Sequence, residues 1–226
     1  MCGRFELAIT EKELIQVFDI DQSQLNIKLP RYNIPPGTPV PIVRQLGKQR
    51  ILDEAYWGLI PSWSKDKKIA QHTINARSET VAEKPSFRAA YKRRRCLLPA
   101  TGYYEWRRLA DNKKQPYWIG LKDKSVFAMA GLYENWVDPQ TGESIESCTI
   151  VTREALSNIK HIHPRMPVIL PRHYYQLWLH NALQDFPLID ADELDSYPIS
   201  PAVNSPHNNY PFPPLDIKND EENEIT

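Results

Sequence analysis

Residues 95–132, RCLLPATGYYEWRRLADNKKQPYWIGLKDKSVFAMAGL, decide the fold class. Short apolar and aromatic runs within this stretch predict four strands, at 96–98, 103–107, 116–121 and 125–132. The links are short, and one contains the turn-forming pair Asp111-Asn112. Short links suit antiparallel neighbours, because parallel strands need long crossover connections. The stretch therefore predicts an α+β fold with a strand-rich antiparallel or mixed sheet, rather than a βαβ fold.

The flanking sequence adds further elements. Strands are predicted over 40–46 and 50–57, around the turn Gly47-Lys48, and over 148–152 after the turn sequence 138–142. A capping box at Thr10-Glu11-Lys12-Glu13 predicts a helix over 10–19. Peripheral helices are also expected over 86–91, 153–159 and 172–180. The segment 31–38, RYNIPPGT, contains two prolines, so we expect an ordered loop or bend rather than a helix or a central strand.

The composition narrows the class of protein. The chain has 226 residues, of which 41% are hydrophobic, enough for one sizeable core or two small ones. We expect no membrane association, because no window reaches the ~18 apolar residues of a membrane span and no signal peptide is recognised. Three cysteines without a C-x-x-C pair fit a reducing, cytoplasmic compartment. His161 and His163 are close in sequence, but the other histidines are scattered, so no metal site is predicted.

Charge is distributed unevenly along the chain. Residues 215–226 contain five acidic side chains and one lysine, a net of −4, which leaves +4 on the rest of a chain whose total is zero. We therefore expect one domain over 1–214, followed by an acidic, disordered tail. We also expect a monomer. The mildly basic body is compatible with nucleic-acid binding but does not require it.

Cys2 is the first candidate for chemistry. If Met1 is removed, Cys2 carries a free α-amine and a thiol on adjacent carbons, with pKa values ordinarily near ~7.7–8.0 and ~8.5. Such an amine condenses with an aldehyde to a Schiff base, and the thiol can then close a five-membered thiazolidine ring without any cofactor. The alternative is an ordinary cysteine that happens to be second in the chain.

Three further residues are candidates for proton transfer or positioning. Glu105 follows aromatic residues on a predicted strand, where desolvation would raise its pKa and suit it to general acid–base catalysis. The alternative is an exposed glutamate paired with an arginine. His163 lies in the proline-flanked segment 161–167, HIHPRMP, and could move protons near neutral pH, or be an ordinary loop histidine. Asn75 could hold an amine or hydroxyl, or serve as a turn or cap residue.

Basic and aromatic side chains accompany these candidates. Arg4, Arg77 and Arg165 each lie two residues from Cys2, Asn75 or His163, so convergence of the candidates would also gather a phosphate-binding rim. Trp57 is predicted to lie in the core, while Trp63 could stack on a base. The basic run 92–95 is interpreted as a solvated face.

Seven blocks in order resemble the SRAP (SOS response-associated peptidase) family. They are MCGRF (1–5), RYNIPP (31–36), WGLIP (57–61), NARSET (75–80), RCLLPA with Gly102 and Glu105-Trp106 (95–106), His163 with RMP (165–167), and PAVN (201–204). The resemblance implies a single compact SRAP domain that binds single-stranded DNA at abasic sites and forms a thiazolidine crosslink through the processed Cys2. One departure is Pro164, where many members have Asp.

The resemblance also implies residue roles. The family's glutamate, histidine and asparagine correspond to Glu105, His163 and Asn75. The expected DNA-binding set is Arg4, Asn33, Trp63, Arg77 and Arg165. No cofactor is expected, the expected location is the cytoplasm beside the nucleoid, and the replication machinery is a candidate partner. An abasic-site lyase side activity follows from the Schiff base. The alternatives are a cysteine autopeptidase that releases Met1, and a non-catalytic single-stranded DNA-binding module.

Overall fold

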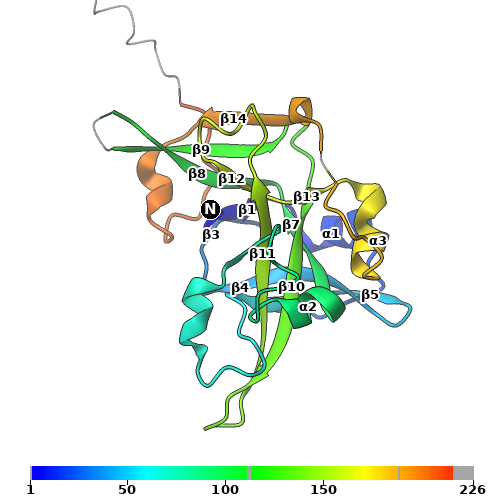
Figure 1. The fold of residues 1–226 in the computed structure, drawn as a ribbon. Coiled ribbons are helices and arrows are strands. Elements are labelled where there is room, and N and C mark those ends of the chain that lie inside the picture. Colours follow the sequence, from blue (N-terminus) through cyan, green and yellow to red (C-terminus); the bar gives the residue numbers. More distant parts are fainter. Residues whose placement is uncertain (1, 111–112, 188, 216–226) are drawn as a thin grey trace, which may run out of the picture.

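Two β-sheets form the centre of the molecule, with short helices around them (Figure 1). The computed structural model describes residues 2–110, 113–187 and 189–215. The first sheet has the antiparallel order β14-β9-β8-β1-β3. Its strands are β1 (Phe5–Leu7), β3 (Arg31–Ile34), β8 (Gly102–Arg108), β9 (Lys114–Leu121) and β14 (Leu194–Pro198).

The second sheet is mixed and has the order β12-β11-β10-β7-β4-β5-β2, with β13 paired to β10 and β6 to β11. Its strands are β2 (Gln22–Ser23), β4 (Pro39–Leu46), β5 (Gln49–Trp57), β6 (Asn75–Arg77), β7 (Arg95–Ala100), β10 (Phe127–Val137), β11 (Ser144–Glu154), β12 (Arg165–Pro167) and β13 (Ile169–Leu170). A parallel pairing of β11 with β5 joins strands far apart in this order. Strands β11, β10, β7, β4 and β5 thereby form a closed ring.

The helices are short. They are α1 (Glu11–Val17), α2 (Arg88–Arg93), α3 (Tyr175–Leu179) and the 3₁₀ turns Lys67–His72, Arg172–Tyr174, Ala191–Glu193 and Pro201–Asn204. The predicted capping box begins α1, because the Thr10 side chain accepts from the Glu13 backbone N–H and the Glu13 carboxylate accepts from the Thr10 N–H. No helix within the described ranges is long and apolar enough to cross a membrane.

The hydrophobic core joins the two sheets. Phe5 of β1 and Trp57 of β5 are fully buried, and their rings meet edge to face with centroids 5.2 Å apart. The indole N–H of Trp57 donates to the carbonyl oxygen of Ile74 at 2.9 Å, which satisfies its polar atom inside the core. Trp57 is therefore a core residue, as the sequence predicts. The contact anchors the first strand of the chain, and so fixes the segment that carries Cys2.

The predicted α+β class and all seven strand predictions are confirmed, and so are the helices near 10–19, 86–91 and 172–180. The helix over 153–159 is wrong. Strand β11 continues to Glu154 because Arg153 and Glu154 pair with β12, and the N–H of Ala155 then donates to the carbonyl oxygen of Pro164. These long-range hydrogen bonds take up the backbone groups that a local helix would need.

Two further predictions concern extended or terminal segments. The loop predicted over 31–38 is wrong for Arg31–Ile34, which forms β3, the edge strand beside β1. The reason is that the prolines follow this strand and do not interrupt its hydrogen bonds. Near the end of the described residues, Pro214 pairs with Ile199 in an isolated β-bridge. The turn at 111–112 and the tail beyond Leu215 lie outside the described residues.

Candidate active site

Cys2 lies three residues before β1, which pairs with β8 and β3 in the first sheet. Its segment is held on one side by β8, where the N–H of Tyr104 donates to the carbonyl oxygen of Arg4 at 2.9 Å. On the other side, the Asn75 amide Nδ2 donates to the carbonyl oxygen of Cys2 at 2.8 Å. Cys2 is fully buried. Burial raises the pKa of its thiol well above the usual range, and the negative charge of Glu105 raises it further.

Glu105 lies on β8 with only 3% of its surface exposed. Burial raises the pKa of its carboxyl group, and the nearby His163 opposes this shift. Tyr103, on the same face of the strand, is completely buried, and burial followed by the charges of Cys2 and Glu105 raises the pKa of its phenol. The strand therefore places a desolvated acid and a neutral phenol beside the Cys2 thiol.

His163 approaches Glu105 from the loop before β12. Its Nδ1 atom lies 3.8 Å from Oε1 of Glu105 and 3.0 Å from both the backbone nitrogen and the carbonyl oxygen of Arg165. In the neutral ring, Nδ1 accepts from that N–H in one tautomer and donates to that carbonyl oxygen in the other. About a quarter of the side chain is exposed, at 24%, so the imidazole lies between the buried carboxyl group and solvent.

Asn75 enters the site from β6, which pairs in parallel with β11. Its amide holds the carbonyl oxygen of Cys2, which refines the expectation that it would orient the amine. The Asn75 Oδ1 atom is buried and accepts no hydrogen bond from the described residues. This oxygen remains an acceptor for a donor brought by a ligand or by a processed N-terminus.

The four chemical candidates thus meet at one place, although they come from four separate segments. Cys2 contacts Asn75 directly, the charge of Glu105 acts on the Cys2 thiol, and His163 faces Glu105. Tyr103 belongs to the same site and was not proposed from the sequence. The signal for it was its position two residues before Glu105, on the same face of the strand.

Some of the predicted DNA-binding residues are exposed, and others are bound to groups of the protein itself. Arg77 is exposed at the end of β6, and the Trp63 side chain is 59% exposed. Arg165 forms a bidentate pair with Glu79, with Nη–Oε distances of 2.5 and 2.9 Å, and also donates to the carbonyl oxygen of Thr152. The Arg165 hydrogen bonds hold the pKa of Glu79 down to about 2. Sequence reasoning missed this carboxylate because its partner is 86 positions away.

Arg4 and Asn33, like Arg165 and Glu79, form a clamp, meaning a set of hydrogen bonds that joins segments distant in sequence. Arg4 Nη1 donates to Asn33 Oδ1 at 2.7 Å and to the carbonyl oxygen of Val203 at 2.8 Å. The buried Asn33 amide donates to the carbonyl oxygens of Val203, Ser205 and Asn208. Both amide atoms of Asn33 are therefore hydrogen-bonded within the protein. Its role as a direct DNA contact stays a prediction.

We expect Asn33→Ala to destabilise the fold. The change removes the donor to three carbonyl oxygens and one of the two acceptors of Arg4 Nη1, which should cost about 2–3 kcal/mol. For a chain of this size the melting temperature should fall by roughly 5–10 °C in a thermal-unfolding measurement. The exposed Asn26→Ala is the matched control and should melt like the parent. An Asn33→Ala protein that melts with the parent would show that the clamp contributes no stability.

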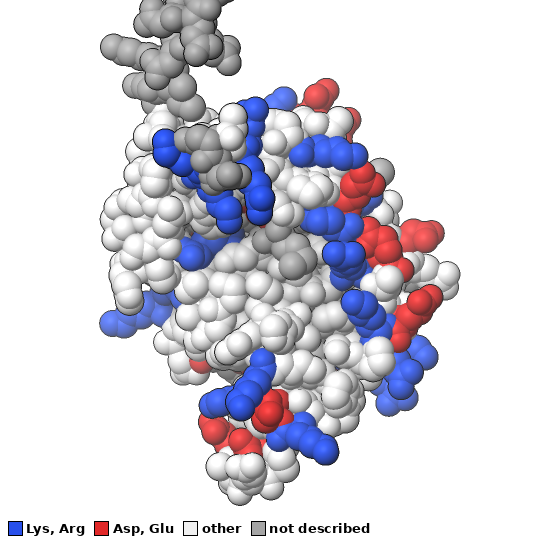
Figure 2. Space-filling view, turned by 60° about the vertical axis from the view of Figure 1, so that its left-hand side comes forward, with Lys and Arg blue, Asp and Glu red and all other residues white. Residues whose placement is uncertain are grey.

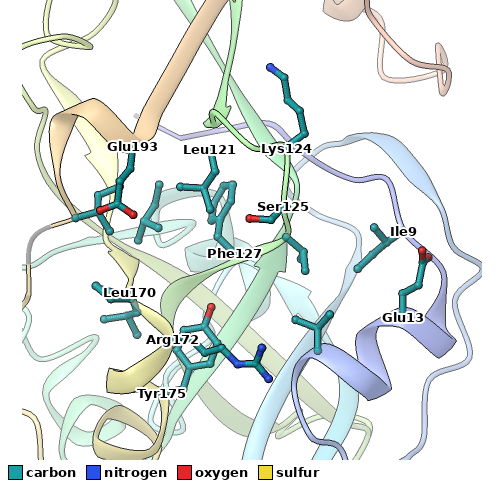
Figure 3. Close-up of a pocket in the computed structure, with 15 residues that line it drawn as sticks. Ile9, Glu13, Leu121, Lys124, Ser125, Phe127, Leu170, Arg172, Tyr175 and Glu193 are labelled. Carbon is teal, nitrogen blue, oxygen red and sulfur yellow. The ribbon is translucent and has the colours of Figure 1, made fainter.

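A separate cavity of about 550 Å³ lies between α1, β10 and α3 (Figure 3). Its wall is mainly apolar and includes Ile9, Phe127 and Tyr175. None of the four chemical candidates lines it. Among the described residues, no three His, Cys, Asp or Glu side chains gather in a way that could hold a metal ion.

Comparison with known proteins adds an independent finding. The family model described as SOS response associated peptidase (SRAP) matches residues 1–206. The chain is 43% identical over 217 residues to Abasic site processing protein YoaM of Bacillus subtilis (strain 168), covering 92% of this chain and 95% of that protein. It is 32% identical over 219 residues to Abasic site processing protein HMCES of Xenopus tropicalis, covering 80% and 64%. A crystal structure of a protein from Bacteroides thetaiotaomicron aligns with a TM-score of 0.83 at 30% identity, covering 92% and 97%.

Proposed function

Because the chain belongs to the SOS response-associated peptidase (SRAP) family, we propose that it processes abasic sites in single-stranded DNA by forming a covalent bond to Cys2. The observation that carries this proposal is the convergence of Cys2, Asn75, Glu105 and His163. The open form of an abasic site presents an aldehyde. An N-terminal cysteine supplies both an amine and a thiol that react with an aldehyde, and the site places an acid–base group beside them.

The first stage is imine formation. After removal of Met1, the neutral α-amine of Cys2 attacks the aldehyde carbon, and proton transfer from nitrogen to oxygen gives a carbinolamine. Protonated Glu105 then gives its proton to the hydroxyl group, which leaves as water, and an iminium ion forms. A carboxyl group whose pKa is raised by burial suits this step, because it keeps its proton to higher pH than an exposed glutamate.

The second stage is ring closure. The buried thiol of Cys2 is largely protonated at neutral pH, since its pKa is raised. The Glu105 carboxylate, left without its proton after dehydration, accepts the thiol proton as sulfur bonds to the iminium carbon. Glu105 returns to its starting state. The net change is one protein and one aldehyde giving one thiazolidine and one water.

The remaining residues position the reactants. Asn75 fixes the carbonyl group of Cys2 and thereby the direction of the α-amine. His163, partly exposed and 3.8 Å from Glu105, would move protons at the sugar oxygen. Arg77 would contact a flanking phosphate and Trp63 would stack on a base, contributing affinity without sequence preference. A single strand suits the site, because an unstacked nucleotide costs less to reach there. The Schiff base can also undergo β-elimination, which would give a lyase side activity.

The test is to incubate the protein with a single-stranded oligonucleotide containing one abasic site and to look for a denaturant-resistant conjugate. We expect a mass equal to the chain lacking Met1 plus the oligonucleotide, less one water. After trypsin digestion, the strand should remain attached to the peptide Cys2-Gly3-Arg4. A matched strand with a tetrahydrofuran analogue, which has no aldehyde, should give no conjugate.

The outcomes separate the other functions. A non-catalytic DNA-binding module would bind both strands equally and form no conjugate, which would overturn the proposal. An autopeptidase is tested by the intact mass of a Cys2→Ala chain. If Met1 is still removed from that chain, an aminopeptidase of the host is sufficient for the processing step.

A further inference from the structure

The hairpin formed by β8 and β9 extends beyond Glu105 and carries an excess of positive charge. Between Trp106 and Tyr117 the sequence has Arg107, Arg108, Lys113 and Lys114 against Asp111, four minus one, a net of +3. The four cationic side chains are exposed. The hairpin projects from the left of the molecule in Figure 1, and Figure 2, with that side turned forward, shows Lys and Arg side chains gathered there.

The fold does not explain this charge. Arg108 and Lys114 are direct cross-strand partners, and like charges in that position destabilise a hairpin. Among the described residues, no acidic side chain forms an ion pair with Arg107, Arg108 or Lys114. By contrast, Arg94 is paired with Glu134 and Arg165 with Glu79. A cost in stability that no internal partner offsets indicates that the three free cations meet an external anion.

The register connects the hairpin to the active site. Side chains alternate along β8, so Arg107 lies on the same face as Glu105, about 6.8 Å further along the strand. Arg108 and its cross-strand partner Lys114 lie on the other face, at the end of the same hairpin. Exposure rises along the face of Glu105, from Tyr103, which is fully buried, through Glu105 at 3%, to the exposed Arg107. A DNA strand whose abasic sugar reaches Cys2 would therefore leave the buried end of the face and pass the cationic end.

We propose that Arg107, Arg108 and Lys114, here called the cationic hairpin, bind the phosphodiester backbone of the nucleotides on one side of the abasic site. The inference rests on the proposed function for the identity of the ligand. The cationic hairpin supplies affinity independent of base sequence, because its positively charged side chains attract phosphate groups and donate hydrogen bonds to them. It lengthens the binding site beyond the nucleotide that reacts.

The test measures binding without the covalent step. The probe is a fluorescent single-stranded oligonucleotide of about 20 nucleotides that contains a tetrahydrofuran analogue, and dissociation constants are measured by anisotropy at several salt concentrations. The variant is Arg108→Gln/Lys114→Gln. The control is Lys12→Gln/Lys48→Gln, which removes the same charge from exposed sites on α1 and the β4–β5 turn, opposite the hairpin in Figure 1.

Removal of two phosphate contacts should reduce the slope of log affinity against log salt by about 1.4, at ~0.7 per contact on a single strand. The parent's affinity should then fall about sevenfold more than the variant's between 50 and 200 mM salt. The control should keep the parent's slope. Arg107→Gln should lower the slope by about 0.7. Equal slopes for the parent and both hairpin variants would overturn the proposal.

Folding is monitored in the same experiment. Because the double variant removes a repulsive pair, its melting temperature should equal or exceed that of the parent. A lost contact therefore cannot be confused with a lost fold. The probe has no aldehyde, so the result is independent of conjugate formation. If the slope changes but no conjugate forms with an authentic abasic strand, the cationic hairpin binds DNA and the covalent mechanism is wrong.

Discussion

Glu105→Gln should slow conjugate formation by about 100-fold or more while leaving DNA binding intact, since a positioned general acid–base group typically contributes 10²–10⁴-fold. The amide keeps the shape of the carboxyl group but can neither donate a proton to the departing water nor accept one from the thiol. The measurement is the single-turnover rate of conjugate formation with an abasic strand, together with the dissociation constant for the tetrahydrofuran strand. The matched control is Glu134→Gln, because burial also raises the pKa of Glu134, which lies on β10 and pairs with Arg94.

The pH dependence has a definite sign. Burial raises the pKa of Glu105, so the protonated form needed for dehydration persists to higher pH and is lost as pH rises through the raised value. The parent's rate should decline on that side of the profile, and the Glu105→Gln rate should show no such decline. An equal rate and the same decline in both proteins would remove Glu105 from the mechanism.

Glu105→Gln should slow the reaction but should not lower the stability of the fold. An acid whose pKa is higher in the folded state than in the unfolded state binds its proton more tightly when folded, so its contribution to stability falls as pH rises above the unfolded value. At neutral pH, burial of this carboxyl group therefore costs stability, and the neutral amide removes that cost. We expect Glu105→Gln to melt no lower than the parent at neutral pH, so slower reaction cannot be attributed to unfolding.

Cys2→Ala should eliminate the denaturant-resistant conjugate. Alanine leaves the α-amine available once Met1 is removed, but it has no thiol to close the ring, so the reaction stops at the reversible imine. Borohydride reduces an imine to a stable amine. The Cys2→Ala protein should therefore be trapped on an abasic strand only when borohydride is present, whereas the parent needs no reductant.

A chemical control separates the roles of the amine and the thiol. A chain that begins at Cys2 and is acetylated on its α-amine keeps the thiol but cannot form an imine, so it should give no conjugate with or without borohydride. Conjugate formation by Cys2→Ala without reductant, at the parent's rate, would contradict ring closure by the thiol. The intact mass of each protein shows directly whether Met1 is absent.

Much of the sheet structure follows from local sequence, because alternation and turn residues act over a few positions. Gly47-Lys48 joins β4 and β5 as predicted, and Trp57 is buried as its apolar surroundings indicate. The helix predicted over 153–159 is wrong for a different reason. Backbone groups there bond to β12 and to Pro164, and no local pattern reports a partner that lies ten residues further on.

The candidate site also has a part that the sequence predicts and a part that depends on contacts between distant segments. The sequence resemblance identified Cys2, Asn75, Glu105 and His163, and the fold brings them together. The clamps around them depend on contacts between distant segments. Glu79 reaches Arg165 across 86 positions, and Asn33 reaches Val203 across 170. Charge and polarity alone could not distinguish an arginine that is open to phosphate from one that is already paired.

The position of β1 between β8 and β3 has a mechanical consequence. A DNA strand joined to Cys2 would be attached three residues from a strand with neighbours on both sides and the fully buried Phe5 beneath it. If a motor protein pulled on such a DNA strand, the force would act on the sheet through β1 and would not be absorbed by a flexible N-terminal segment. Extraction would then begin with the rupture of β1 from its neighbours, and the force at which the protein gives way would be set by that ladder of hydrogen bonds.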